Sequence, residues 1–300
     1  MQTVRTPGSA RAIARTLRRP VGFVPTMGAL HAGHRALVRR ARAESASVVA
    51  SIFVNPLQFG PGEDYEKYPR AFARDVEILE EEGVDLLYAP AVERMYRPGF
   101  AARIGVGDLG SVFEGARRPG HFDGVATVVA KLLNAIEPTA LYLGQKDVQQ
   151  TAVLRAMVRD LDMATNVVVV PTVREPDGLA LSSRNAYLSE PERAAAPSIY
   201  RALSAIAAAL AGGVANPTLA LAAGEGLLEQ PLAWDYLAIV DPLTFEEHET
   251  IVLPALVVAV ARAGATRLLD NVPVAAPGGV DPIVTPPRPL VKRVETRSLR

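Results

Sequence analysis

Two histidines stand three residues apart in the stretch VPTMGALHAGHRALVRRA, residues 24–41. His31 and His34 lie where an apolar, strand-like run gives way to a helical pattern. Free backbone N–H groups and the helix macrodipole favour anions at such a helix N-terminus. A turn by itself needs no imidazole, so the pair of histidines indicates a binding or catalytic site.

Three predicted helices share one arrangement, in which a hydrogen-bonding side chain begins an apolar stripe. Residues three and four apart lie on one helix face, and the stripes are His34, Leu37 or Val38, Ala41; His121, Val125, Val128, Leu132; and Gln150, Leu154, Met157, Leu161. A single first-turn histidine or glutamine is more often a cap or a satisfied core side chain. Helix N-termini of a parallel α/β sheet lie at the carboxyl ends of the strands, where ligands bind. The three together therefore predict one shared pocket.

Other motifs that could carry chemistry are weaker. GVGDLG (105–110) satisfies G-x-G-x-x-G, but SVFEGARRPG after it is not expected to form a helix and no βαβ unit surrounds it, so we predict a turn. Four histidines without HExxH leave zinc without a third ligand. Magnesium arriving with nucleotide phosphates needs only a carboxylate or two. Asp75 is the candidate, and the alternative places it on the solvated face of a charged helix.

Covalent catalysis is not indicated. The chain has no cysteine and no G-x-S-x-G elbow, and the double serine of SSRN (182–185) is expected in a polar loop.

Alternating strands and helices must position these residues. Strands are predicted at 21–25, 48–54, 85–90, 140–144 and 166–171, and helices at 34–46, 71–83, 121–137 and 147–161. The strands are nearly continuous apolar runs, as is typical of parallel strands covered on both faces. The pattern predicts an α/β fold with a doubly wound parallel sheet.

The character of the chain changes after Pro171. A turn-rich segment leads into an alanine-rich helical region (192–211), a second helical stretch, and strands in AWDYLAIV, LPALVVAVA and TRLLDNV. We predict a first domain over 1–172 and a second, smaller α+β domain over 173–275. Residues 276–300 mix proline, glycine and basic side chains and are expected to form a poorly ordered tail.

Composition agrees with a globular enzyme. The chain has 300 residues, of which 49% are hydrophobic, and 32 basic residues balance 32 acidic ones. This balance gives no electrostatic case for nucleic acid or a membrane surface as partner. No apolar run reaches the roughly 18 residues of a membrane helix. The acid-free, arginine-rich start resembles an organelle transit peptide, but we favour a surface helix with Ile13 and Leu17 on one face. With no cysteine, a cytoplasmic enzyme is expected.

Several motifs occur in the order found in one known family. PTMGALHAGH resembles the H-x-G-H signature of the adenylyl-transferring superfamily related to class I aminoacyl-tRNA synthetases. The resemblance is narrowed to the pantothenate synthetase (pantoate–β-alanine ligase) family by SIFVNPLQF, EKYPR, RRPGHFDGVATVVAKL, LGQKDVQQ, VPTVRE and LALSSRN. It runs from Val21 to Leu188.

This resemblance implies a ligase that condenses pantoate with β-alanine through a pantoyl adenylate, using ATP and Mg²⁺ and releasing AMP and pyrophosphate. It also implies a Rossmann-like nucleotide- and pantoate-binding domain, a smaller lid domain and a homodimer. Positioning and charge stabilisation can carry such a reaction without a protein nucleophile. The alternatives are another H-x-G-H nucleotidyltransferase and a catalytically inactive nucleotide-binding regulator.

The resemblance also implies roles for individual residues. The catalytic set would be His31, His34, Lys146, Ser182, Ser183 and Arg184. The nucleotide site would add Met27, Gly28, Ala29, Leu30, Gly144, Gln145, Asp147, Val173 and Leu181. Gln58 and Gln150 would bind pantoate, with Asn55, Arg118 and His121 as secondary candidates. Gln145 stands where glutamate is common in this motif, which we do not interpret as loss of activity.

Overall fold

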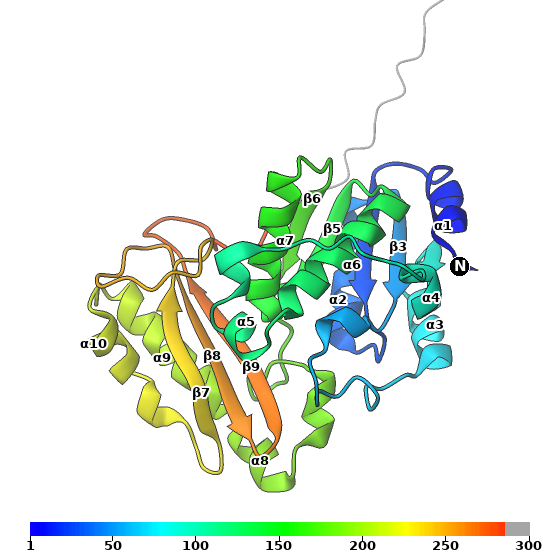
Figure 1. Ribbon diagram of the computed structural model, residues 1–300. Helices are drawn as coiled ribbons and strands as arrows, with labels where there is room; N and C mark the ends of the chain where they lie inside the picture. Colours follow the sequence, from blue (N-terminus) through cyan, green and yellow to red (C-terminus); the bar gives the residue numbers. More distant parts are fainter. Residues whose placement is uncertain (286–300) are drawn as a thin grey trace, which may run out of the picture.

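Two sheets organise the protein in the computed structural model, which describes residues 1–285 (Figure 1). The first sheet is parallel and has the order β1-β4-β3-β2-β5-β6. Its strands are β1 (Gln2–Val4), β2 (Val21–Thr26), β3 (Ser47–Ile52), β4 (Leu86–Tyr88), β5 (Ala140–Gly144) and β6 (Asn166–Val170). The helices around it are α1 (Pro7–Ala14), α2 (Ala32–Glu44), α3 (Phe72–Glu81), α4 (Val92–Met95), α5 (Glu114–Arg117), α6 (His121–Ile136) and α7 (Val148–Asp160). The predicted doubly wound sheet is confirmed.

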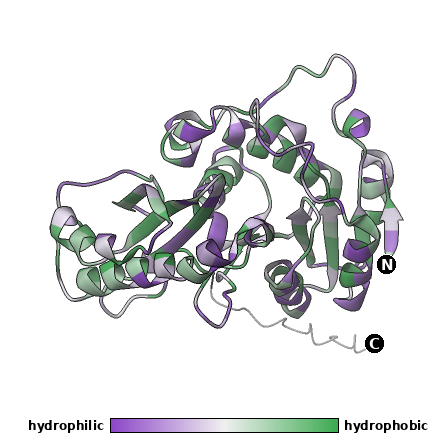
Figure 2. Cartoon of the chain, turned by 90° about the horizontal axis from the view of Figure 1, so that it is seen from below, coloured by the Kyte–Doolittle hydropathy of each residue, from purple (hydrophilic) through white to green (hydrophobic). Residues whose placement is uncertain are grey.

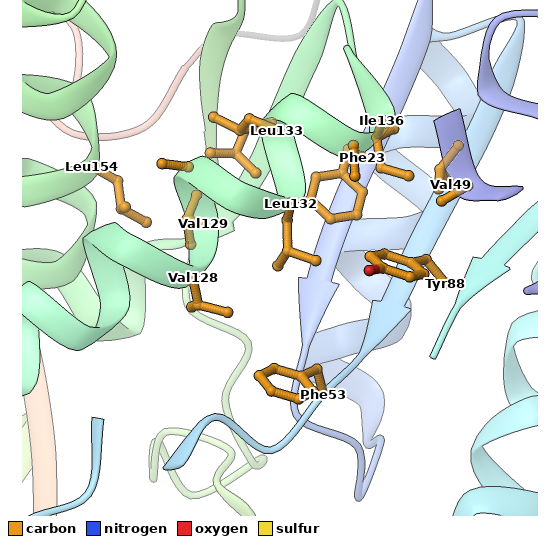
Figure 3. Packing of buried hydrophobic residues seen from close by; sticks show 14 of the residues in the cluster. Phe23, Val49, Phe53, Tyr88, Val128, Val129, Leu132, Leu133, Ile136 and Leu154 are labelled. Atoms are coloured by element: carbon orange, nitrogen blue, oxygen red, sulfur yellow. The ribbon is translucent and has the colours of Figure 1, made fainter. Parts of the chain in front are cut away.

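Helices cover both faces of this sheet, which explains its continuous apolar strands. Successive side chains of a strand point to opposite faces. Phe23 of β2 therefore belongs to the core beneath α1, α6 and α7, whereas Val24 packs with α2 and α3 on the other face. Figure 3 shows Phe23 and Val49 of the first core facing Leu132 and Ile136 of α6. Apolar residues line the sheet, and polar residues lie mainly on the outside (Figure 2).

The strand order reverses between β2 and β5. The chain runs outward from β2 through β3 to β4, then returns to place β5 on the other side of β2. In open α/β sheets the crevice at such a switch point, outside the carboxyl ends of the strands, binds ligands. The loops that follow Thr26 and Gly144 leave β2 and β5 at this crevice.

The second sheet is antiparallel, with strands β7 (Ala233–Val240), β8 (Ala255–Ala263) and β9 (Thr266–Val274). Helices α8 (Glu190–Ala195), α9 (Ser198–Ala211) and α10 (Pro217–Ala222) accompany it. Ile199, Leu203 and Ile206 of α9 pack against this sheet. The chain also forms short 3-10 helices at η1 (Pro56–Gln58), η2 (Gly107–Gly110), η3 (Gln145–Asp147), η4 (Ser183–Tyr187) and η5 (Glu225–Leu227).

One helical stretch of the described chain, Glu190–Ala211, is long and apolar enough to cross a membrane by length and composition alone. Half of that window is buried inside the protein, as in the core helix of a globular domain.

An ion-pair cluster joins helix α5 to the second sheet. Asp235 of β7 contacts Arg117 of α5 and Arg262 and Arg267 of the second sheet. Arg267 also makes two hydrogen bonds to the carboxylate of Glu114, which is 6% exposed. Removing one partner of a buried ion pair leaves an uncompensated charge, so this cluster ties α5 to the second sheet.

Several expectations about the elements are wrong. The first helix was expected to carry Ile13 and Leu17 on one face, but α1 ends at Ala14 and Leu17 lies outside it. Residues 2–4 form strand β1 beside β4, which was not predicted. Glu114–Arg117 is one turn of helix, although SVFEGARRPG was expected to be non-helical. The predicted helical region 192–211 is present as two helices, α8 and α9, that meet at Pro197. Leu161, expected on an inward stripe, is 52% exposed because α7 ends at Asp160.

The predicted poorly ordered tail is also wrong for residues 281–285, and residues 286–300 lie outside the described residues. Ile283 is 2% exposed and packs in an apolar cluster that joins α7 and β6 to the second sheet. The N–H of Thr285 donates to the carbonyl of Val169 at 3.1 Å, on the edge strand β6. Arg155 and Arg40 donate to the carbonyls of Ile283 and Thr285 at 2.7 Å.

Candidate active site

A cavity of about 270 Å³ opens at the switch point. The predicted site residues that line it are Met27, His31, His34, Asn55, Gln58, Arg118, His121, Gly144, Lys146, Asp147, Gln150, Val173, Leu181, Ser182, Ser183 and Arg184. Its floor is apolar and includes Val125, Val128 and Leu132 of α6. A cleft of about 800 Å³ between the two sheets shares Lys146, Arg184 and several other residues with it. The three polar residues that begin α2, α6 and α7 thus meet in one pocket.

His31 and His34 form the N-terminal cap of α2. The N–H of Gly33 donates to Nδ1 of His31 at 3.1 Å, and the N–H of His31 donates to Nδ1 of His34 at 3.2 Å. An imidazole whose Nδ1 accepts a hydrogen bond is neutral and carries its proton on Nε2. Each histidine therefore has an Nε2–H donor left for a ligand.

Both histidines are held in the neutral form. Burial lowers the pKa of His34 to about 3, and the neighbouring His31 ring contributes to this shift. Burial, followed by the charge of Lys146, also lowers the pKa of His31. An anion bound against these rings would oppose the shifts.

Asp75 holds the loop that precedes the histidines. Its carboxylate accepts hydrogen bonds from the N–H groups of Ala29 and Leu30 at 2.9 and 2.8 Å. Ala29 has φ 51°, a left-handed conformation that needs such support. Asp75 is 1% exposed, so the alternative of a solvated face is wrong. The predicted magnesium role is not supported either, because both oxygens already serve the loop and Asp75 is outside the cavity lining.

Gln58 lies at the centre of a buried hydrogen-bond network. Its main-chain carbonyl accepts from Arg118 at 3.1 Å and from His121 at 2.7 Å. Its side-chain oxygen accepts from Asn55 at 3.1 Å. A Cβ atom at position 124 would lie 2.2 Å from the carbonyl oxygen of Leu57, so Gly124 permits α6 to pack this closely against η1.

His121 uses both ring nitrogens within the protein. A carbonyl can only accept, so Nδ1 carries the proton toward Gln58, and Nε2 accepts from Arg118 at 3.1 Å. Burial, followed by the Arg118 charge, lowers the pKa of His121 to about 4. Glu63 holds Arg118 through both carboxylate oxygens, at 2.9 and 2.6 Å. Arg118 and His121 line the cavity, but their polar atoms mainly hold Gln58 in place.

Cationic and hydroxyl side chains from η3, η4 and the residue before η4 also line the cavity. Lys146 is in η3 and Arg184 in η4, where Ser182 caps the first turn by accepting from the N–H of Arg184. Arg184 reaches across to Asp64 at 3.4 Å. These cations and the two neutral imidazoles make an anion-binding surface.

Tyr68 and Thr172 are among the cavity residues that sequence analysis did not single out. Tyr68 is 9% exposed and lines the cavity together with Ser183. The hydroxyl of Thr172 is buried without a hydrogen-bond partner among the described residues. Both residues fall in motifs already singled out, EKYPR and VPTVRE, but neither is a type that periodicity alone marks as functional.

Some predicted nucleotide contacts are not side chains of the cavity. Gly28, Ala29 and Leu30 are outside the lining. Gln145 is 6% exposed and faces the second sheet, where it donates to Asn271 Oδ1 at 3.2 Å. Its side-chain oxygen accepts from the N–H of Thr172 at 3.3 Å. Gln145 therefore joins η3 to β9.

The described residues contain no group of three or more histidine and acidic side chains arranged to hold a metal ion. Asp147 lines the cavity, and Asp64 contacts Arg184 at 3.4 Å. The residues thus do not form a protein cage for a cation. A cation that keeps several waters and binds mainly to phosphates would need no such cage.

The parallel sheet, the histidine-capped helix at its switch point and the cationic side chains of the cavity define a nucleotide-binding α/β enzyme. Residues 2–273 match the family model for pantoate-β-alanine ligase. Pantothenate synthetases from Thermus thermophilus and Herpetosiphon aurantiacus are 54% and 52% identical to the chain, over 91% and 90% of it and 99% of each relative. The chain belongs to the pantoate–β-alanine ligase family, and the predicted ligase class is confirmed.

Solved structures of family members have the same fold as this chain. The crystal structure of pantothenate synthetase from Thermus thermophilus has a TM-score of 0.87 and 54% identity, covering 92% of this chain and 100% of that one. Pantoate-β-alanine ligase from Francisella tularensis, complexed with beta-gamma ATP and β-alanine, has a TM-score of 0.75 and 33% identity, covering 91% and 97%. Another type of nucleotidyltransferase is not favoured.

Proposed function

We propose that this enzyme condenses pantoate with β-alanine at the expense of ATP through a pantoyl adenylate. The observation that carries the proposal is the single cavity that joins the histidine-capped helix to Gln58 and Gln150. One part of it suits phosphates, and the other offers amide groups to a small hydroxy acid. The family relationship supports the same reaction.

The first step transfers an adenylyl group. The pantoate carboxylate attacks the α-phosphorus of ATP, an acyl–phosphate bond forms, and pyrophosphate leaves. The Nε2–H groups of His31 and His34 donate to phosphate oxygens, and Lys146 and Arg184 offset the charge that develops in the transition state. Ser182 and Ser183 bind the phosphates from the side of the second sheet.

The second step forms the amide. The neutral amine of β-alanine attacks the acyl carbon of the adenylate, AMP leaves with the electron pair of the acyl–oxygen bond, and the nitrogen loses a proton to solvent. No protein nucleophile is required, since a correctly oriented pair of reactants removes most of the entropic barrier. Gln58 and Gln150 hold the pantoyl group, and Met27, Gly144, Asp147, Val173 and Leu181 surround the nucleotide.

The proposal also covers the domains, the metal ion, the compartment and the oligomeric state. Residues 173–275 act as a lid over the nucleotide-binding domain of residues 1–172. Mg²⁺ would arrive with the ATP phosphates and offset part of their charge. The enzyme works in the cytoplasm as a homodimer, with small molecules rather than nucleic acid or membrane as its substrates.

Pyrophosphate exchange into ATP tests the adenylation step. With pantoate and Mg²⁺ present and β-alanine absent, we expect pantoate-dependent exchange. His34→Ala and Lys146→Ala should each reduce it by about 10²-fold or more while the fold is kept. His248→Ala is the matched control, because His248 is exposed and outside the cavity.

Either result is informative. If exchange is absent, AMP formation with both substrates present would mean that pyrophosphate release depends on β-alanine. Absence of AMP as well would exclude the ligase. Near-normal turnover of His34→Ala or Lys146→Ala would remove that residue from the mechanism.

A further inference from the structure

Tyr96 lies directly behind the amide network of the cavity without lining it. It follows α4, and its hydroxyl donates to Asn55 Oδ1 at 2.7 Å. This is the shortest hydrogen bond of the Asn55 side chain, whose other three are 3.1, 3.1 and 3.3 Å long. Asn55 is 1% exposed, so losing a hydrogen bond to its side-chain oxygen would cost free energy.

Two backbone groups set the direction of the Asn55 amide, and the Tyr96 hydroxyl holds the oxygen in that direction with the shortest of its hydrogen bonds. The carbonyl of Gly124 can only accept, so it faces the Asn55 nitrogen, and the N–H of Leu57 can only donate, so it faces the oxygen. The second hydrogen of the Asn55 nitrogen is then donated to the side-chain oxygen of Gln58. Gln58 is left with its NH₂ group beside the sulfur of Met27, 3.1 Å away, and the cavity.

We propose that Tyr96 is a positioning residue for pantoate, acting through Asn55 to hold the Gln58 amide with its donor toward the cavity. The inference rests on the proposed function, because it takes pantoate as the molecule bound beside Gln58. A donor in that place suits the carboxylate and hydroxyl oxygens of a hydroxy acid.

The ring of Tyr96 is held independently of its hydroxyl. It packs against Phe100 and Phe53 with centroid distances of 4.9 and 6.1 Å, and the Lys131 ammonium is 5.8 Å from its centroid. Tyr96→Phe should therefore keep the packing and remove one hydrogen bond. The matched control is Tyr88→Phe, which removes a hydroxyl from a tyrosine of the same core, on β4 and outside the cavity lining (Figure 3).

The experiment compares Michaelis constants. In Tyr96→Phe we expect the KM for pantoate to rise about three- to tenfold, as for loss of one buried hydrogen bond, with the KM for ATP nearly unchanged. In a Gln58→Ala background, Tyr96→Phe should add no further increase, because the effect passes through Gln58. Tyr96→His keeps a ring N–H donor and should restore part of the affinity. If Tyr96→Phe does not fold, the pantoate KM of Tyr96→His is compared with that of Tyr96→Leu, which has no donor.

Failure of this inference is distinct from failure of the proposed function. An active wild type with the same pantoate KM in Tyr96→Phe and Tyr88→Phe would overturn the role of Tyr96 alone. Additive effects of Tyr96→Phe and Gln58→Ala would also overturn it. A wild type without pantoate-dependent exchange or AMP formation would overturn the proposed function and this inference together.

Discussion

The backbone N–H of His31 donates to Nδ1 of His34 at 3.2 Å, and the centroids of the two rings are 4.2 Å apart. The same two side chains cap α2 and line the cavity. The cap uses the Nδ1 atoms and leaves the Nε2–H groups to a ligand. One side of each ring therefore stabilises the helix, and the other side is available to bind an anion.

Acid should destabilise the protein through its buried histidines. In the unfolded chain a histidine titrates near 6.5, whereas the folded pKa is about 3 for His34 and about 4 for His121. Between these values the unfolded chain binds more protons. Stability is therefore complete above about pH 6.5 and falls on acidification, by at most about 1.4 kcal/mol per pH unit for each histidine.

Urea denaturation at pH 7 and pH 5 measures this loss. His34→Gln keeps a side chain that suits the third position of a helix and does not titrate, so its stability should depend less on pH. His248→Gln, at an exposed position, should behave as the wild type does. Equal pH dependence in all three proteins would contradict the assignment.

Asp75→Asn should weaken ATP binding without touching the cavity. An amide offers one oxygen where the carboxylate offers two, so one of the N–H groups of Ala29 and Leu30 would lose its acceptor. We expect a loss of about 1–3 kcal/mol in stability and a higher KM for ATP. Glu77→Gln, exposed on the same helix, is the control for thermal denaturation and kinetics. Wild-type behaviour of Asp75→Asn would show that the loop needs no carboxylate.

Gln145→Glu should destabilise the junction between η3 and β9. Asn271 donates to the carbonyls of Gln145 and Lys146, which fixes its own oxygen toward the Gln145 amide. A glutamate would place acceptor against acceptor in a buried position, at a cost of about 1–3 kcal/mol. Thermal denaturation beside the exposed Gln230→Glu control measures this cost. An unchanged Tm would mean that Asn271 adapts to either residue.

Ile283→Ala should destabilise the protein by about 2–4 kcal/mol, since it empties a buried position shared by both sheets. Val280→Ala, at a residue that is 74% exposed, should have little effect. Chemical denaturation of both variants, and of a chain ending at residue 280, tests the role of residues 281–285. Equal stability of all of these proteins would refute it.

Short windows of sequence predict the strands and the inward-facing helix positions. The strands at 21–25, 140–144 and 166–171 and the inward positions of His34, His121 and Gln150 follow from periodicity along short windows. Tyr96 and Asn55 are 41 residues apart, and Gln145 and Asn271 are 126 apart. Their partnership depends on how the elements pack, which no window of the sequence contains. The segment 281–285 was misjudged because its composition is loop-like, although one isoleucine and backbone hydrogen bonds fix it.

Thr285 has a consequence for self-association. The outermost strands of an open sheet present unpaired backbone groups to which another chain can add a strand. On β6 the N–H and carbonyl of Val169 are already taken by Thr285, and β1 at the opposite border has only three residues. A second copy of the chain cannot add a strand to the central sheet at Val169 while residues 281–285 stay in place. Open-ended growth of one sheet through many chains is therefore blocked at this position of the central sheet.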